Sequence, residues 1–448
     1  MLIVGGGISG LATAYFLSRR SIQSTIVEAG PRLGGLIRTD IVEGCQLEAG
    51  PDSFIAAKPA VTELAREIPV LEEQIIGSND QSRRIFLVKN GELVPMPKGM
   101  VMMVPGDLES ARNSALFSNA SNEVFEREQL QKPRLRSEDT SVAEFVLDHF
   151  DQTVLDYVTE PLLAGVYGGD ARKLSVMSVL PRFLEYERQY GSLIRAVAHE
   201  QRSRQGGSLF LSFRNGMQAL PDAIEQQLRG WCTVLHEEAQ CVERMAGGKW
   251  RVNVRGGSLT AERIVIALPA HRAARVLEQA APGVSADLSA IPYSSAITVT
   301  VGFQRDRFPH PLDGFGFLVP RVERRQVAAC TWVNTKFPER VARGYAVLRA
   351  FIVGDTAEEL MPASDTELIE TVAAELRRFM GVDVKPVFHT VNRWQSSMPQ
   401  YLVNHRSRVE NIRSGVAELQ GLEITGNAYD GVGIPDCVRL ARETAERF

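Results

Sequence analysis

The sequence predicts a mixed α/β and α+β fold, in which a helical domain and an antiparallel-sheet domain are inserted into a discontinuous parallel-sheet domain. Three observations favour this organisation. A short apolar strand, a glycine-rich turn, a helix and a second strand occupy residues 1–28. Alternating strand and helix patterns return at 208–268 and again at 422–448. Because alternating strands and helices build parallel sheets, these distant segments are expected to share one sheet.

The stretches between these segments have different periodicities. Residues 107–207 have mostly helical spacing of apolar residues, whereas alternating β-rich runs from 294 to 353 predict an antiparallel sheet. The expected domain bounds are 1–86, 208–281 and 412–448 for the parallel-sheet domain, 87–207 for the helical domain and 282–411 for the antiparallel-sheet domain, with a boundary at Gly206-Gly207.

Individual elements follow from periodicity and turn residues. Asn90-Gly91 predicts the turn of a hairpin between strands at 85–88 and 93–94. The polar stretch 118–141 is expected to be a solvated helix, with a loop as the alternative. The other expected elements are strands at 233–235, 239–244, 250–254, 263–268, 296–303 and 422–425, and helices at 60–76, at 365–380 and from about 435.

Composition and charge narrow the class of protein. The chain has 448 residues, and 50 Lys+Arg against 54 Asp+Glu give a net charge of −4. This balance argues against nucleic acid as a partner, since contacts to phosphates require a basic surface. The five cysteines form no CxxC pair, so neither a disulfide framework nor a metal site is expected. Since there is neither a signal-peptide pattern nor an apolar run of membrane-spanning length, we expect a cytoplasmic location.

The turn after the first strand carries the strongest motif. It reads Gly5-Gly6-Gly7-Ile8-Ser9-Gly10, which matches GxGxxG. The first glycine permits a tight turn, the second lets the backbone approach a pyrophosphate, and the third lets the helix pack closely on the strand. Glu28 ends the second strand and can accept hydrogen bonds from both hydroxyls of a ribose. The motif therefore predicts a dinucleotide site at the N-terminus of the first helix.

Two later glycine turns favour FAD over NAD as the dinucleotide. Arg32 can pair with phosphate, and Gly34-Gly35 lets the backbone approach a second part of the ligand. Residues 50–53 add another turn with backbone donors, for which a purely structural role is the alternative. Protein contacts that continue well past the adenosine half of the cofactor are more typical of FAD than of NAD.

Six longer segments match a known family. They are EAGPDSF (48–54), EPLLAGVYGGDARKLSVMSVLPRF (160–183), YGSLIRA (190–196), FRNGMQALPDAI (213–224), MPQYLVNH (398–405) and GNAYDGVGIPDCV (426–438). Together they resemble the protoporphyrinogen/coproporphyrinogen oxidase family of haem-pathway flavoenzymes, within the amine-oxidase-like FAD fold. The resemblance spans nearly the whole chain. It implies a discontinuous Rossmann-like FAD domain, a helical domain, an antiparallel-sheet substrate domain, and FAD held without a covalent bond.

The resemblance also implies cofactor contacts at matching positions. The final helix would direct its positive N-terminus at reduced flavin. For Val242 and Trp394, ordinary packing in a strand or core is the alternative. The implied contacts are Gly5, Gly6, Gly7, Ile8, Ser9 and Gly10 with the pyrophosphate, Glu28 and the adjacent Ala29 at the ribose, Arg32, Gly34, Gly35 and Leu36 along the cofactor, Gly50, Pro51, Asp52 and Ser53 towards the flavin, Val242 at adenine, Trp394 near the flavin, and Gly426, Val432, Gly433 and Ile434 at the flavin and ribitol.

One segment departs from the plant and animal members of the family. There an arginine after a Pro-x-Gly turn grips a substrate propionate, whereas this chain has Val101 at that position, after Pro97-Lys98-Gly99. The segment is more similar to the bacterial coproporphyrinogen-oxidising branch. Lys98 and Arg182 are the candidate cations for propionates, with a solvated surface role as the alternative. The other candidate substrate contacts are Gly165, Tyr167, Phe317 and Phe351, with core packing as the alternative for the rings.

The activity that the resemblance implies is the six-electron oxidation of a porphyrinogen. The substrate would be coproporphyrinogen III or protoporphyrinogen IX, hydride would pass to flavin N5, and O2 would reoxidise the flavin and give H2O2. No catalytic residue is assigned, because the seven histidines are scattered. A flavin amine oxidase or carotenoid desaturase, a non-catalytic flavin- or porphyrin-binding scaffold, and an NAD-dependent dehydrogenase are the alternatives. Peripheral membrane contact through residues 100–104 and contact with haem-pathway enzymes are left open.

Overall fold

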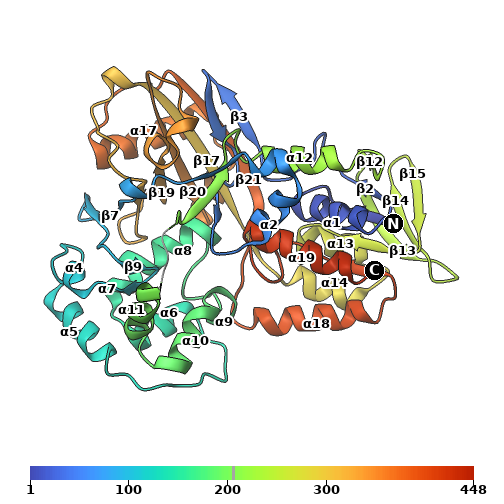
Figure 1. Ribbon diagram of the computed structural model, residues 1–448, viewed down its shortest axis with the longest axis horizontal. Helices are drawn as coiled ribbons and strands as arrows, with labels where there is room; N and C mark the ends of the chain where they lie inside the picture. Colours follow the sequence, from blue (N-terminus) through green and yellow to red (C-terminus); the bar gives the residue numbers. More distant parts are fainter. Residues whose placement is uncertain (204–206) are drawn as a thin grey trace.

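A five-stranded parallel sheet lies at one end of the molecule, with both termini beside it (Figure 1). The structure, a computed structural model, describes residues 1–203 and 207–448. The strand order is β12 (Cys232–Leu235), β2 (Ser24–Val27), β1 (Leu2–Val4), β16 (Ile264–Ile266) and β22 (Leu422–Ile424). Three distant segments therefore build one sheet, which confirms the predicted fold class. The domain bounds stay a prediction, and Gly206 of the expected boundary lies outside the described residues.

Both faces of this sheet are covered, which explains why its strands are almost wholly apolar. On one face, Ile3, Ile26 and Val265 pack against α1 (Ile8–Arg19), α2 (Ala60–Glu67), α12 (Ala219–Gln227) and α19 (Ile434–Glu446). On the other face, Leu2 and Ile266 pack with a second set of elements. These are α13 (Ala270–Leu277), α14 (Pro282–Ser289), α18 (His405–Ala417) and the antiparallel strands β13 (Ala239–Arg244), β14 (Trp250–Val254) and β15 (Gly257–Ala261).

A seven-stranded sheet forms the second part of the molecule. Its order is β21 (Phe388–Pro399), β17 (Tyr293–Gln304), β20 (Tyr345–Val353), β19 (Ala329–Trp332), β18 (Gly316–Leu318), β7 (Ile85–Lys89) and β8 (Glu92–Pro95). Ile297 and Val299 pack on one face with Leu376 of α17 (Asp365–Met380), while Thr298 and Thr300 face the opposite side. The predicted Asn90-Gly91 hairpin is confirmed as β7–β8, and it pairs in parallel with β18.

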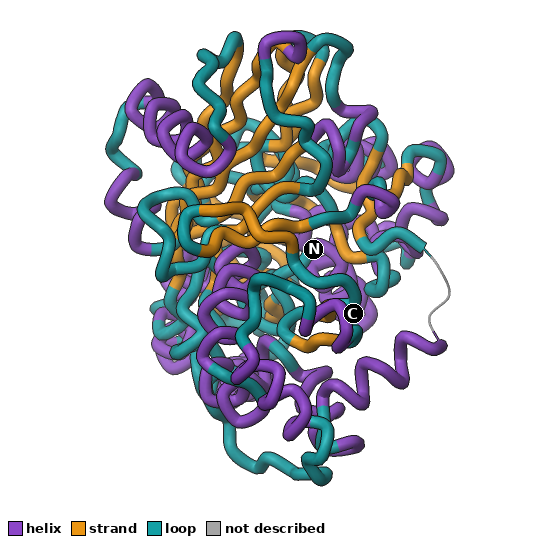
Figure 2. Tube along the Cα trace, turned by 90° about the vertical axis from the view of Figure 1, so that its left-hand side faces the viewer, coloured by secondary structure: helices purple, strands orange, loops and turns teal. Residues whose placement is uncertain are grey.

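The helical part lies against one end of this sheet. Figure 2 shows the strands gathered in the upper half of the molecule and most helices below them. Phe125, Phe145 and Leu193 are fully buried at its centre. The helices are α4 (Leu108–Arg112), α5 (Asn119–Glu128), α6 (Val142–His149), α7 (Gln152–Val154), α8 (Glu160–Tyr167), α9 (Val176–Val179), α10 (Pro181–Tyr190) and α11 (Leu193–Ser203), with a π-helical turn at Leu155–Thr159 and the short pair β9 (Met100–Val101) and β10 (Val104–Pro105).

Three local expectations differ from the structure. The helix expected at 60–76 ends at Glu67, because Pro69 starts a separate turn, α3 (Pro69–Glu72), and β6 (Ile75–Gly77) follows. Within the polar stretch 118–141, α5 is followed by irregular chain. Strand β15 was not predicted, although polar and apolar residues alternate from Ser258 to Ala261. No helix among the described residues is long and apolar enough to cross a membrane.

The remaining short elements connect the parts. Strands β3 (Thr39–Val42) and β4 (Cys45–Glu48) form a hairpin that leads into the turn at 50–53. Strand β11 (Phe210–Phe213) pairs with both β5 (Phe54–Ile55) and β6. The chain therefore enters this small sheet, through β5, directly after the turn. Helices α15 (Val333–Lys336) and α16 (Asp355–Leu360) flank β20. The turn at 50–53 is therefore held between two small sheets, close to the large one.

Candidate active site

The glycine-rich turn lies at the carboxyl end of β1, and the structure shows what each glycine permits. Gly5 has φ +107°, and a Cβ added to it would lie 2.5 Å from the carbonyl oxygen of Ala267. A Cβ on Gly10 would lie 1.9 Å from the carbonyl oxygen of Gly5. By contrast, a Cβ on Gly7 would meet only the Cα of Gly35, at 4.0 Å. The first and third glycines are thus required by packing, whereas Gly7 borders open space.

That open space adjoins hydrogen-bonding groups that fit a dinucleotide. The N-cap of α1 is Gly7, so no side chain caps the helix, and its first backbone N–H groups are available. At the end of β2, the Glu28 carboxylate accepts hydrogen bonds from the N–H groups of Gly6 and Gly30, at 2.6 and 2.7 Å. An uncapped helix N-terminus suits a pyrophosphate, and a carboxylate beside the glycine turn suits the diol of a ribose. The residues present therefore fit FAD.

Arg32 holds its own loop together. Its guanidinium donates to the carbonyl oxygens of Leu33, Ile37 and Gly35 instead of extending into the open space. It thereby fixes the loop after β2, in which Gly34 donates its N–H to the Gly6 carbonyl at 2.8 Å. The expected contact between Arg32 and phosphate stays a prediction, and these three hydrogen bonds would compete with it. The three carbonyls occupy donors of both Nη1 and Nη2 of the guanidinium.

The turn at 50–53 is anchored to the seven-stranded sheet. The Ala49 carbonyl accepts hydrogen bonds from Trp394 Nε1 at 2.8 Å, Thr298 Oγ1 at 3.0 Å and Arg349 Nη2 at 3.3 Å. Arg349 also donates to the Gly50 carbonyl. Sequence reasoning found Trp394 but missed Thr298 and Arg349. A single arginine in the apolar strand β20 was the available signal, because a buried charge needs partners.

Beneath this turn lies a cluster of buried charges. Asp52 pairs with Lys336 at 2.8 Å, and Glu48 pairs with Arg340 at 3.1 Å. Burial alone would raise the pKa of Asp52, but Lys336 and Arg349 outweigh it and hold that pKa well below its usual value. For Glu48, burial raises the pKa even though Arg340 opposes the change. The cations therefore keep Asp52 charged and hold the turn in place.

An apolar face lies next to the same turn. Phe351, Trp394 and Met398 from the sheet are partly exposed and cluster with the buried Ala164 of α8. The Arg349 guanidinium lies 4.6 Å from the centre of the Phe351 ring, so one side chain contacts both this face and the Gly50 carbonyl. Phe351 therefore lies on the apolar face beside the turn at 50–53, and its contact with substrate stays a prediction.

Phe317 is not placed there, and the expectation for it is wrong. It is 1% exposed and packs against Phe379 of α17, with ring centres 5.6 Å apart. Its neighbour Leu318 packs instead with the helical part. Because side chains alternate along a strand, the prediction selected the residue one position away from the face it required.

The remaining candidate substrate residues lie on or near the helical part. Tyr167 is buried, and its carbonyl accepts hydrogen bonds from Ser294 Oγ and Gln400 Nε2. Gly165 is exposed, with no atom near an added Cβ.

Both candidate cations lie beside α11. Arg182 is exposed and pairs with Glu200 of that helix. Lys98 is also exposed, and the carbonyl of the next residue, Gly99, accepts from Gln201 of α11 at 3.0 Å. The structure therefore brings Lys98 and Arg182 near the same C-terminal end of α11, and no contact among the described residues places either of them at the apolar face.

The loop from Gly426 to Ile434 connects the parallel sheet to the helical part. Gly426 has φ +141°, a conformation that favours glycine, and a Cβ added to it would lie 3.9 Å from the Leu268 carbonyl oxygen and from the Tyr429 ring. Val432 packs with the helical part, whereas Ile434 packs with α1. The N-terminus of α19 differs from the expectation, because the Asp436 carboxylate accepts from the Gly433 N–H and pairs with Lys58 at 2.7 Å. That carboxylate offsets the positive end of the helix, so the expected stabilisation of negative charge there is reduced.

The side chains of Tyr401, which the sequence did not single out, and His405 hold this loop. The Tyr401 hydroxyl donates to the Asn427 carbonyl at 2.6 Å and accepts from the Gly431 N–H at 3.0 Å. The His405 ring stacks on Tyr401, 4.0 Å between ring centres, and its Nε2 contacts the Tyr429 carbonyl at 3.2 Å. Both lie in the family-like segment 398–405. Their role is positional, since they fix the backbone that leads into α19.

We expect His405 to make the protein less stable in acid. Burial lowers the pKa of His405 from 6.5 to about 4, so the folded chain keeps the ring neutral where the unfolded chain would protonate it. The free energy of unfolding should therefore fall as pH decreases from about 6.5 to about 4, by at most about 3 kcal/mol. In urea unfolding at a series of pH values, His405→Gln should flatten this slope. The control variant, His199→Gln at an exposed position, should leave the slope of stability against pH unaltered. If His405→Gln also left that slope unaltered, the account would be contradicted.

Val242 lies on the outer strand of the sheet β13–β14–β15. Its side chain is fully buried with Trp250 and Val252. The side chain is therefore a core residue, and its proposed backbone contact with adenine stays a prediction.

Comparison with known proteins agrees with this arrangement. The flavin containing amine oxidoreductase family matches residues 8–448. Coproporphyrinogen III oxidase of Bacillus subtilis (strain 168) is 31% identical over 98% of this chain and 95% of its own. Protoporphyrinogen oxidase 2, chloroplastic/mitochondrial, of Arabidopsis thaliana is 25% identical over 99% of this chain and 92% of its own.

A solved structure is similar over the same extent. A crystal structure from Exiguobacterium sp. 255-15, provisionally named a protoporphyrinogen oxidase, has a TM-score of 0.89 and 30% identity, and the match covers 100% of this chain and 97% of that one. A structure of putrescine oxidase bound to putrescine, 15% identical with a TM-score of 0.68, shares the fold. The chain therefore belongs to the flavin containing amine oxidoreductase family, and within it to the group of coproporphyrinogen III and protoporphyrinogen oxidases.

Proposed function

We propose that this protein is an FAD-dependent enzyme that oxidises a porphyrinogen to a porphyrin in haem biosynthesis, with coproporphyrinogen III as the preferred substrate. The full-length similarity to coproporphyrinogen III oxidase, at 31% identity, carries the proposal. The apolar face formed by Phe351, Trp394 and Met398 supports it, because it lies beside the turn that would approach the flavin.

The residues of this chain bind, orient and exclude water. Bound FAD supplies the hydride acceptor. Gly7 and the uncapped N-terminus of α1 would bind its pyrophosphate, and Glu28 would bind its ribose. Arg349 and Trp394 fix the backbone at Ala49 and would thereby orient the cofactor-facing turn towards the apolar face. The apolar side chains of Phe351, Trp394 and Met398 suit a reaction whose difficult step belongs to the cofactor.

Two further parts of the proposal concern charge and the electron acceptor. Lys98 and Arg182 would meet propionate groups at the α11 end of the substrate site, Arg182 after release from Glu200. The four propionates of coproporphyrinogen would use both cations, whereas protoporphyrinogen offers only two propionates. O2 would be the final acceptor and H2O2 the second product, in a cytoplasmic enzyme with peripheral contact to the membrane or to other haem-pathway enzymes.

Comparative turnover tests the proposal. The FAD-loaded protein is given coproporphyrinogen III, protoporphyrinogen IX, an amine and a carotene under air, while porphyrin fluorescence and peroxide are recorded. Coproporphyrinogen III should give the fastest rise in fluorescence, with peroxide formed in parallel. Turnover of the amine or the carotene alone would assign another activity of the family, and a yellow protein inert towards all four would indicate a binding scaffold.

A further inference from the structure

A buried cluster of charged side chains joins the helices of the helical part. It consists of Glu128 at the end of α5, Arg136 in the irregular chain that follows, His149 at the end of α6 and Glu187 in α10. These side chains are at most 6% exposed. The proposed reaction uses none of them. Because burying a charge is costly unless it is paired, the pairing within this cluster indicates its role.

Both nitrogen atoms of the His149 ring contact carboxylates. Nδ1 lies 3.0 Å from Glu128 Oε1, and Nε2 lies 3.3 Å from Glu187 Oε1. A neutral imidazole donates from one nitrogen only, so the lone pair of its other nitrogen would face a negatively charged oxygen. An imidazolium donates from both nitrogens. The two contacts therefore favour a protonated ring, provided that both carboxyl groups are themselves ionised.

The Glu187 carboxylate is kept ionised by a cation on its other side. It accepts hydrogen bonds from Arg136 Nε at 2.8 Å and from Arg136 Nη2 at 3.0 Å. Burial would raise the pKa of Glu187, but His149 and Arg136 outweigh burial and lower that pKa. Arg136 also pairs with Asp148, which lies further out at the surface together with Arg134. The two buried carboxylates, the guanidinium and a protonated ring together carry no net charge.

The Glu128 carboxylate connects the ring to the start of α11. It accepts from Ser192 Oγ and from the Leu193 N–H, both at 2.6 Å, and from the Ile194 N–H at 3.3 Å. The first N–H groups of a helix have no partner within it, and a negative charge there is also favoured by the helix dipole. Since all these donors require an acceptor, Glu128 is ionised. The His149 ring and the start of α11 therefore share one carboxylate.

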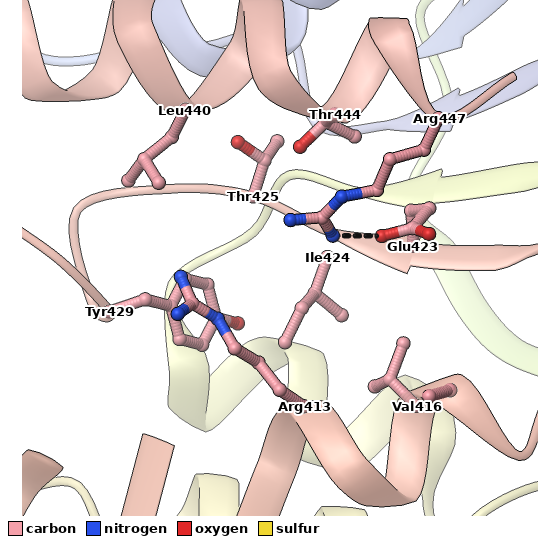
Figure 3. Close-up of a pocket in the computed structure, with 10 residues that line it drawn as sticks. Arg413, Val416, Glu423, Ile424, Thr425, Tyr429, Leu440, Thr444 and Arg447 are labelled. Atoms are coloured by element: carbon pink, nitrogen blue, oxygen red, sulfur yellow. Dashed lines mark hydrogen bonds and ion pairs between the residues drawn. The ribbon is translucent and has the colours of Figure 1, made fainter. Parts of the chain in front are cut away.

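The buried His405 has different partners from His149. Its Nε2 contacts a carbonyl oxygen, that of Tyr429, and its ring stacks on Tyr401. Figure 3 shows Tyr429 beside Arg413 of α18. Burial lowers the pKa of His405 to about 4, whereas at His149 the two carboxylates outweigh burial and raise the pKa. The two rings are 4% and 3% exposed, so the partners and not the burial account for the difference.

We propose that His149 is a buried imidazolium that fastens the start of α11 to α5, α6 and α10, and that loss of its proton to solvent loosens this junction as pH rises. The folded chain binds this proton more tightly than the unfolded chain does. The stabilisation is therefore complete below about pH 6.5 and is lost as pH rises beyond it. A deprotonated ring would leave one uncompensated negative charge in the core. The direction is opposite to that expected for His405, and it does not depend on the proposed activity.

Nitrogen NMR of the FAD-loaded protein with labelled histidine tests the charge of the ring. At about pH 7, both ring nitrogens of His149 should give imidazolium shifts, whereas His405 should give those of a neutral ring. The absence of these signals in His149→Gln assigns them. Glu187→Gln should move the titration of His149 to lower pH. The matched control is Glu185→Gln, because Glu185 lies on the same helix and pairs with Arg188 at the surface, at 2.6 Å.

Two results of the NMR titration would overturn the proposal. One is a neutral His149 ring at about pH 7. The other is a titration of His149 that Glu187→Gln and Glu185→Gln leave equally unchanged. If His149→Gln does not fold, the signals that move in Glu187→Gln but not in Glu185→Gln identify the same ring.

Hydrogen exchange at the start of α11 tests whether the proton holds the junction. The Leu193 and Ile194 N–H groups bond to Glu128, so their protection factors should fall by up to about tenfold per pH unit above about pH 6.5, as the loss of one proton requires. Glu185→Gln should show the same fall, whereas in His149→Gln protection should be low throughout. Protection that stays constant while NMR shows the ring losing its proton would mean that the ring only fills space, and would contradict the proposal.

Discussion

Gly10→Ala should abolish FAD binding together with part of the protein's stability. The added methyl group would lie 1.9 Å from the Gly5 carbonyl oxygen, which belongs to backbone that cannot move without displacing α1 from β1. Overpacking against backbone should cost about 3 kcal/mol or more of the free energy of unfolding. Urea unfolding and the flavin absorbance of the purified variant measure the two effects. A yellow variant of normal stability would contradict the assigned packing.

Gly7→Ala is the matched control, because it separates packing from cofactor binding. Its methyl group meets only the Cα of Gly35, at 4.0 Å, so the stability of the protein without FAD should change little. The same methyl group projects into the space assigned to the pyrophosphate. FAD affinity should therefore fall by about ten- to a hundredfold, as measured by fluorescence titration of the apoprotein. Unchanged affinity would mean that the pyrophosphate does not lie over Gly7.

The second large effect is expected for Arg340→Met. Arg340 is 2% exposed and pairs with Glu48 at 3.1 Å, so the substitution leaves a buried carboxylate without its cation. Removing one partner of a buried pair typically costs about 3–5 kcal/mol. Thermal and urea unfolding should show a loss of this size. Glu48→Gln/Arg340→Met should recover much of it, because no unpaired charge remains.

The double variant also tests whether the loss of stability comes from the unpaired charge or from lost packing. Glu48 and Arg340 lie beneath the turn at 50–53, and Arg340 donates to the Asp52 carbonyl at 3.0 Å. If the pair acts only on stability, the double variant should bind FAD normally once it is folded. A double variant as unstable as Arg340→Met would show that the lost packing of the side chain, and not the unpaired charge, sets the cost.

Sequence patterns predicted those helices, strands and turns whose structure is set by residues close together in the chain. The strand, glycine turn and helix at the N-terminus, the Asn90-Gly91 hairpin and the helix at 365–380 all arise from local backbone preferences and apolar periodicity. The close approach of Gly10 to Gly5 follows from the same local geometry. Their prediction needed no knowledge of distant parts of the chain.

The contacts that complete the site could not be predicted in this way. Asp52 pairs with Lys336, 284 positions further along the chain, and Arg349 reaches Ala49 across 300 positions. Such pairings are set by how the domains pack, and one sequence carries no record of them. Phe317 shows a second limit, because a register error of one residue moves a side chain to the opposite face of a sheet.

An anaerobic single-turnover experiment tests the central claim most directly. Excess FAD-loaded protein is mixed with coproporphyrinogen III without O2, while flavin absorbance and porphyrin fluorescence are followed together. Since six electrons leave the macrocycle and each FAD takes two, about three equivalents of protein-bound FAD should lose their visible absorbance for each porphyrin that appears. Flavin absorbance that persists while the porphyrinogen remains unchanged, or a purified protein that carries no flavin, would contradict the account.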